Sequence, residues 1–201
     1  ITFILPPANM SGGIKLVSIY ATILAAQGHK VTLVSPPPQP ILLRRKLKSL
    51  VFGKGWPSTT SQVSQLDGLG LDHRIIECYR PITDRDVPDA DVVIATWWET
   101  AEWVNALHGN KGAKVYFVQG HEVFDYLPIK RCEATYRMPL HKIVIARWLS
   151  EVMRDKYGDS CVDIVPNSVD HEQFHAAARG KQSRPTVGFL YHEIHFKGLD
   201  T

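Results

Sequence analysis

Residues 1–35 read ITFILPPANMSGGIKLVSIYATILAAQGHKVTLVS, and this stretch decides the fold. The apolar run at 1–6 predicts a buried strand, and the run at 31–34 predicts a second one. Between them, apolar side chains recur at helical spacing from 16 to 24, and Gly28 supplies a helix stop. A strand, a helix and a second strand in this order predict a βαβ unit, which builds a parallel sheet.

The same alternation continues along the chain. Short runs rich in β-branched residues predict further strands at 74–78, 92–96, 115–119, 143–146 and 163–165. Helices are predicted between them at 99–107 and 149–157, the second one ending at Gly158. The chain is therefore expected to be of the α/β class, with a doubly wound, Rossmann-like parallel sheet.

A change of composition near the end of the sequence predicts a domain boundary. Residues 180–184, GKQSR, are small and polar and precede an apolar run at 186–190. We expect a first domain at 1–180, and in 181–201 a linker with the first strand of a second domain. A sequence that starts without Met and stops soon after this strand is expected to be a fragment of a longer protein.

The composition excludes several classes of protein. With 44% hydrophobic and 21% charged residues, the chain is typical of a globular domain rather than of a disordered or membrane-spanning one. A net charge of +3 is too small to predict a nucleic-acid partner. The cysteines at 78, 132 and 161 lie far apart, which argues against a disulfide framework or a zinc site and favours a reducing, cytoplasmic location.

Residues 41–52, ILLRRKLKSLVF, mix basic and apolar side chains. Such a segment can lie on an anionic membrane surface, which would make the protein a peripheral one on the inner face of the membrane. The alternative is an exposed amphipathic helix that packs its apolar side on the sheet. The sequence leaves both interpretations open.

Candidate functional residues follow the predicted strands, because parallel α/β sheets bind ligands at the carboxyl ends of their strands. Gly12 and Gly13 follow the first strand and begin a helix, where glycine lets a phosphate approach the backbone; the alternative is a simple turn.

His121 follows the strand at 115–119 and could donate to an anionic group or polarise a hydroxyl; the alternative is a hydrogen bond within its loop. Trp98 and Glu99 follow the strand at 92–96 and could contact a sugar, although some tryptophans of this region are expected in the core.

Several of these segments resemble the large retaining group 1, or family 4, glycosyltransferases of the GT-B fold. The resemblance rests on the glycine pair and helix followed by GHKV at 28–31, on PNSVDHEQF at 166–174, and on VGFLYHEIHFKG at 187–198. Three positions depart from the family pattern: Ser168 stands where the family has glycine, His192 stands where it has arginine, and His121 resembles a family histidine that often stands one or two residues earlier.

The resemblance implies a role for each candidate. Gly12, Gly13, His192 and Lys197 would bind the diphosphate of the donor, and His121 would face the reacting sugar. Trp98 and Glu99 would lie on the acceptor side. The sequence would then be the amino-terminal, acceptor-side half of a two-domain GT-B enzyme, inactive without its second domain.

The implied reaction transfers a sugar from a nucleotide-sugar to a hydroxyl of a saccharide or lipid-linked acceptor, with retention of configuration. The nucleotide-sugar is a co-substrate, and the resemblance implies neither a metal nor another cofactor. Two alternatives stay open: a GT-B epimerase or phosphorylase, and a non-catalytic binding half-domain. A dinucleotide-dependent dehydrogenase is less favoured, because the first turn lacks a complete Gly-x-Gly-x-x-Gly and prolines follow Ser35 where an acidic residue is needed.

Overall fold

The computed structural model of the protein describes residues 1–40, 50, 52, 63–178, 180, 181 and 183–188. The contacts divide the chain into two compact units, Ile1–Asn167 and Ser168–Thr201. Every helix and strand whose bounds are given below belongs to the first unit.

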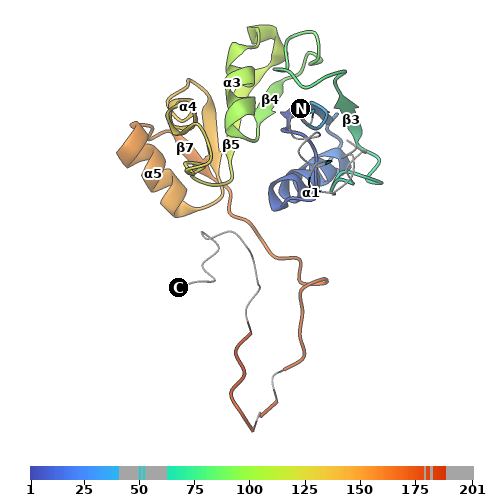
Figure 1. The fold of residues 1–201 in the computed structure, drawn as a ribbon, viewed down its shortest axis with the longest axis vertical. Helices are drawn as coiled ribbons and strands as arrows, with labels where there is room; N and C mark the ends of the chain where they lie inside the picture. Colours follow the sequence, from blue (N-terminus) through green and yellow to red (C-terminus); the bar gives the residue numbers. More distant parts are fainter. Residues whose placement is uncertain (41–49, 51, 53–62, 179, 182, 189–201) are drawn as a thin grey trace. The chain divides into compact units, whose positions relative to one another are not determined.

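The first unit contains a seven-stranded sheet in its described part, with the order β3-β2-β1-β4-β5-β6-β7. All neighbouring strands are parallel. The strands are β1 (Thr2–Ile4), β2 (Thr32–Ser35), β3 (Asp72–Ile75), β4 (Val92–Ala95), β5 (Ala113–Val118), β6 (His141–Val144) and β7 (Val162–Ile164). Figure 1 shows β3 and β7 at opposite ends of this unit. The predicted doubly wound α/β sheet is confirmed.

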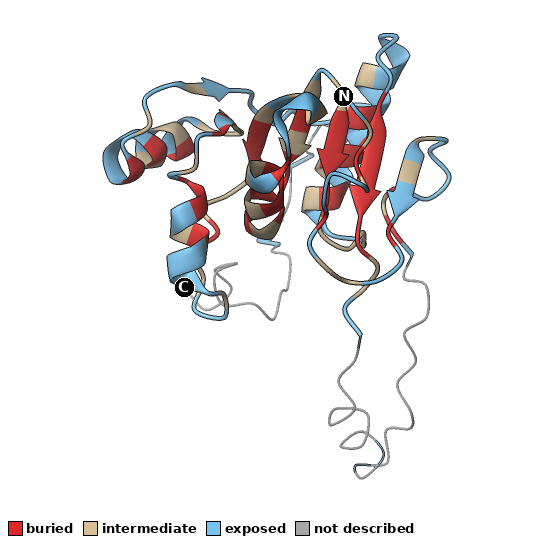
Figure 2. Ribbon diagram, turned by 90° about the horizontal axis from the view of Figure 1, so that it is seen from above, coloured by how far each residue is buried: buried red, intermediate tan, exposed pale blue. Residues whose placement is uncertain are grey.

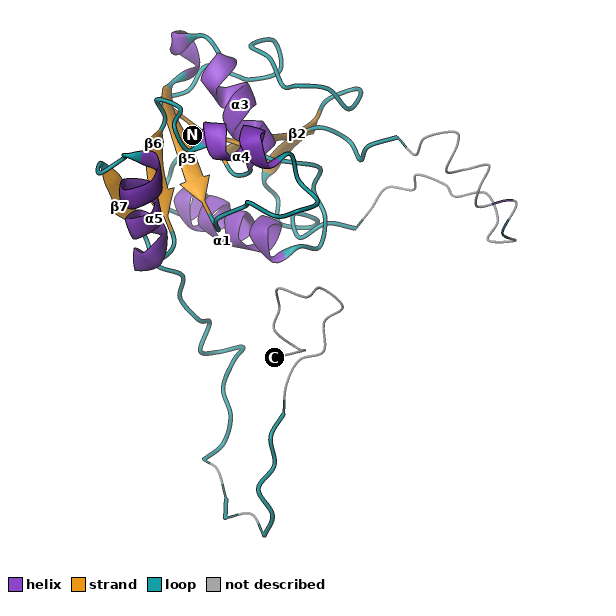
Figure 3. Cartoon of the chain, turned by 60° about the vertical axis from the view of Figure 1, so that its left-hand side comes forward, coloured by secondary structure: helices purple, strands orange, loops and turns teal. Residues whose placement is uncertain are grey.

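The helices whose bounds the described residues give are α1 (Gly12–Ala26), α3 (Trp98–Ala106), α4 (Ile129–Thr135) and α5 (Arg147–Tyr157), with a short 3₁₀ helix at Gly109–Lys111. Gly28 and Gly158 follow α1 and α5 with φ of 91° and 76°, a left-handed conformation that ends a helix at little cost only in glycine. The sequence did not predict α4, which lies beside α3 (Figure 3).

The helices cover both faces of the sheet, because successive side chains of a strand point to opposite faces. On one face, Phe3 and Leu33 pack with Ile14, Val17 and Ala21 of α1. On the other face, the core contains strand residues together with residues of α3 and α5: Ile4, Val34, Val93, Val144, Val104, Leu149 and Met153. The central strands are accordingly buried, as Figure 2 shows in red, whereas β3 and β7 at the edges are more exposed.

The order of the strands reverses between β1 and β4. From β1 the chain proceeds outward through β2 to β3, and from β4 it proceeds outward in the other direction to β7. The loops that follow β1 and β4 therefore leave the carboxyl edge of the sheet toward different faces, since α1 packs on one face and α3 on the other. In parallel α/β sheets this reversal is where ligands bind.

The second unit, Ser168–Thr201, has neither helix nor strand among its described residues. Residues 186–188, the described part of the strand predicted at 186–190, are not in a strand. The domain boundary at 180 stays a prediction. In the family-like segment 166–174, the Asp170 carboxylate accepts hydrogen bonds from the amides of Glu172 and Gln173 and so closes a turn. No non-glycine residue in the described ranges has a positive φ, so Ser168 does not adopt the left-handed conformation that favours glycine.

Three sequence predictions concern residues outside the described ones: the basic segment 41–52, except for positions 50 and 52, and the residues His192 and Lys197. None of the helices in the described part of the chain combines the length and the apolar character that crossing a membrane requires.

Candidate functional site

Gly12 and Gly13 form the first turn of α1, directly beyond the loop that follows β1. Ser11 caps the helix by accepting a hydrogen bond from the amide of Ile14, and the Asn9 carboxamide accepts one from the amide of Ser11. Within the described residues, the amides of Gly12 and Gly13 have no hydrogen-bond partner. A Cβ added at Gly12 would meet no atom within 4 Å, so a ligand can approach the backbone there.

The loop after β5 reaches the same place. A Cβ added at Gly13 would lie 3.3 Å from Oε1 of Gln119, which immediately follows β5. The Gln119 side chain, from the loop that also carries Gly120 and His121, thus lies beside Gly13. The fold brings together the two regions that the sequence indicated for phosphate and for the reacting sugar, although they are far apart in the chain.

His121 lies in an aromatic cluster and is half-buried. Its Nε2 is 2.6 Å from the hydroxyl oxygen of Tyr157, at the end of α5. The imidazole also packs on the rings of Tyr136 and Tyr157, with centroids 5.6 Å and 5.8 Å away. Burial lowers the pKa of His121, the nearby Lys156 lowers it further and Glu133 opposes the shift, so the imidazole is neutral at physiological pH.

Tyr136 fixes the backbone on both sides of His121. Its hydroxyl accepts a hydrogen bond of 2.8 Å from the amide of Glu122 and donates one of 3.2 Å to the carbonyl of Gly120. The Tyr136 side chain is fully buried and stacks on Tyr116 of β5. One phenol therefore holds the peptide groups before and after the candidate catalytic residue.

Glu122 is a functional candidate that the sequence analysis did not select. Its side chain is buried, with 6% of the residue exposed, and its Oε2 has no hydrogen-bond partner in the described part of the chain. Burial raises the pKa of this carboxyl to about 8, against the lowering effect of the Trp98 amide at the start of α3. The signal in the sequence was an acidic residue in the loop that follows a buried strand, next to the candidate His121.

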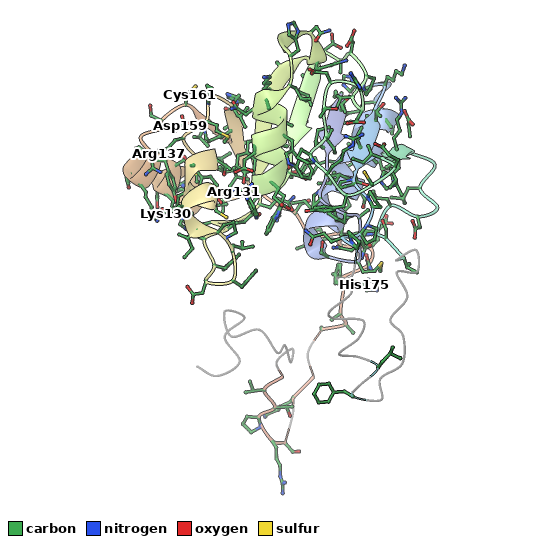
Figure 4. The ribbon with its side chains drawn as sticks, turned by 45° about the horizontal axis from the view of Figure 1, so that its top comes forward. Lys130, Arg131, Arg137, Asp159, Cys161 and His175 are labelled. Atoms are coloured by element: carbon green, nitrogen blue, oxygen red, sulfur yellow. The ribbon has the colours of Figure 1, made fainter. Side chains whose placement is uncertain are left out.

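Trp98 and Glu99, the predicted acceptor residues, have different surroundings. Trp98 is 4% exposed and forms part of the packing between α3 and α4. Arg131 reaches from α4 toward α3 (Figure 4), where its guanidinium lies 4.9 Å from the centroid of the Trp98 ring and pairs with Glu102 at 2.6 Å. A ligand therefore cannot stack on Trp98 unless Arg131 moves.

Glu99, in contrast, is half-buried and remains accessible. It accepts a hydrogen bond of 3.1 Å from the hydroxyl of Tyr79. Burial raises the pKa of the Glu99 carboxyl, whereas Tyr79 and Arg131 lower it. Of the two residues, Glu99 is the one with a polar group available to a ligand.

A small pocket lies beyond the carboxyl ends of β2 and β3, and the sequence did not point to it. Ser35 and His73 meet there through a hydrogen bond of 2.8 Å. The lining combines polar groups with proline rings and small apolar groups: Ala8, Ser35, Pro36, Pro37, Pro38, Ser64, Asp67, His73 and Ile75. The pocket opens on the same edge of the sheet as Gly12 and His121.

No metal centre is present in the described ranges, where no group of three or more His, Cys, Asp or Glu side chains could hold a metal ion. The chain does contain two Asp-x-Asp sequences, at 84–86 and 89–91. Both precede β4 and lie toward the amino edge of the sheet, opposite the candidate site, where Asp84 accepts a hydrogen bond from the amide of His108 and Asp89 pairs with Lys111 at 2.8 Å.

No family model matches the chain, and no curated protein matches it. Among solved structures, the chain is similar to a glycosyltransferase from Rickettsia africae ESF-5, with a TM-score of 0.43 and 13% sequence identity. The match covers 85% of this chain and 43% of that one, so the chain spans less than half the length of the glycosyltransferase.

Proposed function

We propose that the chain is the acceptor-side domain of a retaining GT-B glycosyltransferase of the group 1 type. The observation that carries this proposal is the contact between Gly13 and Gln119. This contact joins the glycine turn and the His121 loop, two segments that resemble family motifs, at the one edge of a parallel sheet where ligands bind.

The glycine turn is proposed to receive the diphosphate of a nucleotide-sugar. The free amides of Gly12 and Gly13 lie at the amino-terminal end of α1, which is the positive end of the helix dipole. The open space at Gly12 admits a phosphate oxygen. We further propose that Lys197 and His192 add positive charge to the leaving diphosphate. No step of this scheme uses a metal ion.

The reaction proposed is the transfer of the sugar to a hydroxyl of a saccharide or lipid-linked acceptor. The acceptor oxygen forms a bond to the anomeric carbon, and the bond from this carbon to the diphosphate oxygen breaks. The bonding electrons leave with the diphosphate, which also takes up the proton of the acceptor hydroxyl. His121 would hydrogen-bond to the reacting sugar, and Glu99, supported by Trp98 behind it, would contact the acceptor.

We also propose where the protein acts. The chain would supply half of the cleft that excludes water, so the 201 residues alone would be inactive. The protein would act in the cytoplasm, and residues 41–52 would contact the inner face of the membrane when the acceptor is lipid-linked.

The test is sugar transfer by the longer protein that contains this sequence, supplied with UDP-, GDP-, dTDP- and ADP-sugars. We expect turnover of one of these donors, and we expect it to fall at least about tenfold in Lys197→Ala because a cation on the leaving group is lost. Lys181→Ala, a nearby lysine without a proposed role, is the matched control. Absence of both turnover and binding for every donor would contradict the proposal, as would transfer by the 201-residue chain alone.

A further inference from the structure

Tyr157 makes the one side-chain hydrogen bond of His121 that the described residues contain. The hydroxyl oxygen and Nε2 are 2.6 Å apart, which is a short hydrogen bond. Because the imidazole also packs on Tyr136 and Tyr157, whose own rings are 4.9 Å apart, its ring cannot turn without breaking this cluster. The bond therefore decides which of the two ring nitrogens remains available.

A hydrogen bond between a phenol and a neutral imidazole can be drawn in two ways. Either the hydroxyl of Tyr157 donates to Nε2, or an Nε2–H of His121 donates to the phenol oxygen. A phenol is a much stronger acid than a neutral imidazole, and an imidazole lone pair is a much stronger base than a phenol oxygen. The first arrangement is therefore the more stable one. It leaves the single proton of the neutral imidazole on Nδ1.

Burial and, to a smaller extent, the charge of Lys156 lower the pKa of His121 and keep the imidazole neutral. The ionisable groups that face the pair come from α4, from the segment just after α4 and from α5: Glu133, Arg137 and Lys156. Glu122 follows His121 in the same loop. Arg137 lies 4.9 Å from the centroid of the Tyr157 ring, and Lys156 lies 5.6 Å from it. Lys156 disfavours the imidazolium, Glu133 is engaged by Lys156 at 2.8 Å, and Glu122 is buried and largely protonated near neutral pH.

We propose that Tyr157 is a positioning residue that donates its hydroxyl proton to Nε2 of His121 and so holds His121 as the Nδ1–H tautomer. His121 then presents Nδ1–H, a hydrogen-bond donor, to a ligand oxygen at the carboxyl edge. Within the glycosyltransferase function proposed above, on which this role rests, His121 donates to an oxygen of the substrate and does not remove a proton from the acceptor. The tautomer itself does not depend on that function.

The test is a long-range ¹H–¹⁵N correlation spectrum of the protein with ¹⁵N-labelled histidine, recorded near neutral pH. The His121 signals are identified by their loss in His121→Gln. We expect a protonated Nδ1 and an unprotonated Nε2 in the wild type. In Tyr157→Phe we expect the proton to move to Nε2, which is the form that neutral histidine favours in water, and the pKa of His121 to rise.

Tyr126→Phe is the matched control, because Tyr126 is exposed and stacks on Phe124 rather than on His121. We expect its spectrum to equal that of the wild type. A protonated Nε2 in the wild type would overturn the proposal, and so would an unchanged tautomer in a folded Tyr157→Phe. If Tyr157→Phe does not fold, the wild-type spectrum alone decides, because the two tautomers give opposite nitrogen shifts.

The spectrum also separates this proposal from the proposed function. It needs no sugar donor, so a protein with the Nδ1–H tautomer but no transferase activity would contradict the function and leave the Tyr157 contact intact. In an active protein, Tyr157→Phe should lower kcat at least about tenfold with a smaller change in KM, because a misplaced donor weakens transition-state binding most.

Discussion

At the scale of single residues, Glu122 has a carboxyl group whose burial opposes its ionisation. Its carboxyl lies beside the first amide of α3, but burial outweighs this contact and raises the pKa of the carboxyl from 4.5 to about 8. In the unfolded chain the same group ionises at its usual pKa. Folding at neutral pH therefore requires either a buried charge or the uptake of a proton, and both destabilise the folded state.

The contribution of Glu122 to the stability of the protein should consequently fall as the pH rises. Below about pH 4.5 the carboxyl is protonated in both the folded and the unfolded state, and it makes no difference to stability. Between about pH 4.5 and pH 8 only the unfolded state releases the proton, so the free energy of unfolding falls by a few kcal/mol across this window. Glu122→Gln, which cannot ionise, should be the more stable protein at pH 8, with the difference shrinking toward pH 5.

Urea unfolding of both proteins across this pH range measures the effect. Glu99→Gln is the comparison, because Glu99 is less buried and should give a smaller change. A wild type and a Glu122→Gln variant with parallel stability curves would show that Glu122 is solvated in the folded protein.

At the scale of elements, the strands and most helices could be predicted from the sequence, because their apolar periodicity is strong. The helix α4 could not, since seven residues are too few to show a period. Pro128, directly before it, was the available start signal. Contacts between elements could not be predicted from the sequence either. His121 and Tyr157 are 36 positions apart, and only the packing of α5 on the sheet brings them together.

The pairing of β4 and β5 depends on Gly112, which the sequence alone did not distinguish from other loop residues. It has a φ of 113°, and an added Cβ would lie 2.6 Å from the carbonyl oxygen of Ala90 and 2.8 Å from backbone atoms of Asp91 and Val92. This close approach lets the chain enter β5 beside the start of β4. Backbone atoms cannot move aside as a flexible side chain can.

We expect Gly112→Ala to lower the free energy of unfolding by about 2 kcal/mol or more, through both strain and overlap. Gly158→Ala is the matched control, because Gly158 has a φ of 76° but open space around it, and strain alone should cost about 1 kcal/mol. Thermal unfolding of the two variants provides the comparison. Equal losses would mean that the contact with Ala90 has no energetic consequence.

At the scale of the whole first unit, the strand order places the candidate site. The sequence predicted a parallel sheet with Gly12, Gly13 and His121 after its strands, and the topology puts these residues at one edge. The sequence could not predict that Trp98 is covered by Arg131, because this depends on how α3 and α4 pack. Nor could it indicate the pocket at Ser35 and His73, whose residues come from separate segments.

The central claim is that the carboxyl edge of this sheet binds the diphosphate of a nucleotide-sugar, and a pair of glycines tests it most directly. Gly12 and Gly109 lie at opposite edges, and a Cβ added at either one meets no atom within 4 Å. Alanine should therefore leave the melting temperature unchanged at both positions. In the longer protein, Gly12→Ala should lower sugar transfer at least about tenfold, because its methyl group occupies the approach of the phosphate, and Gly109→Ala should leave transfer at the wild-type rate. Equal transfer by the two variants would contradict the claim.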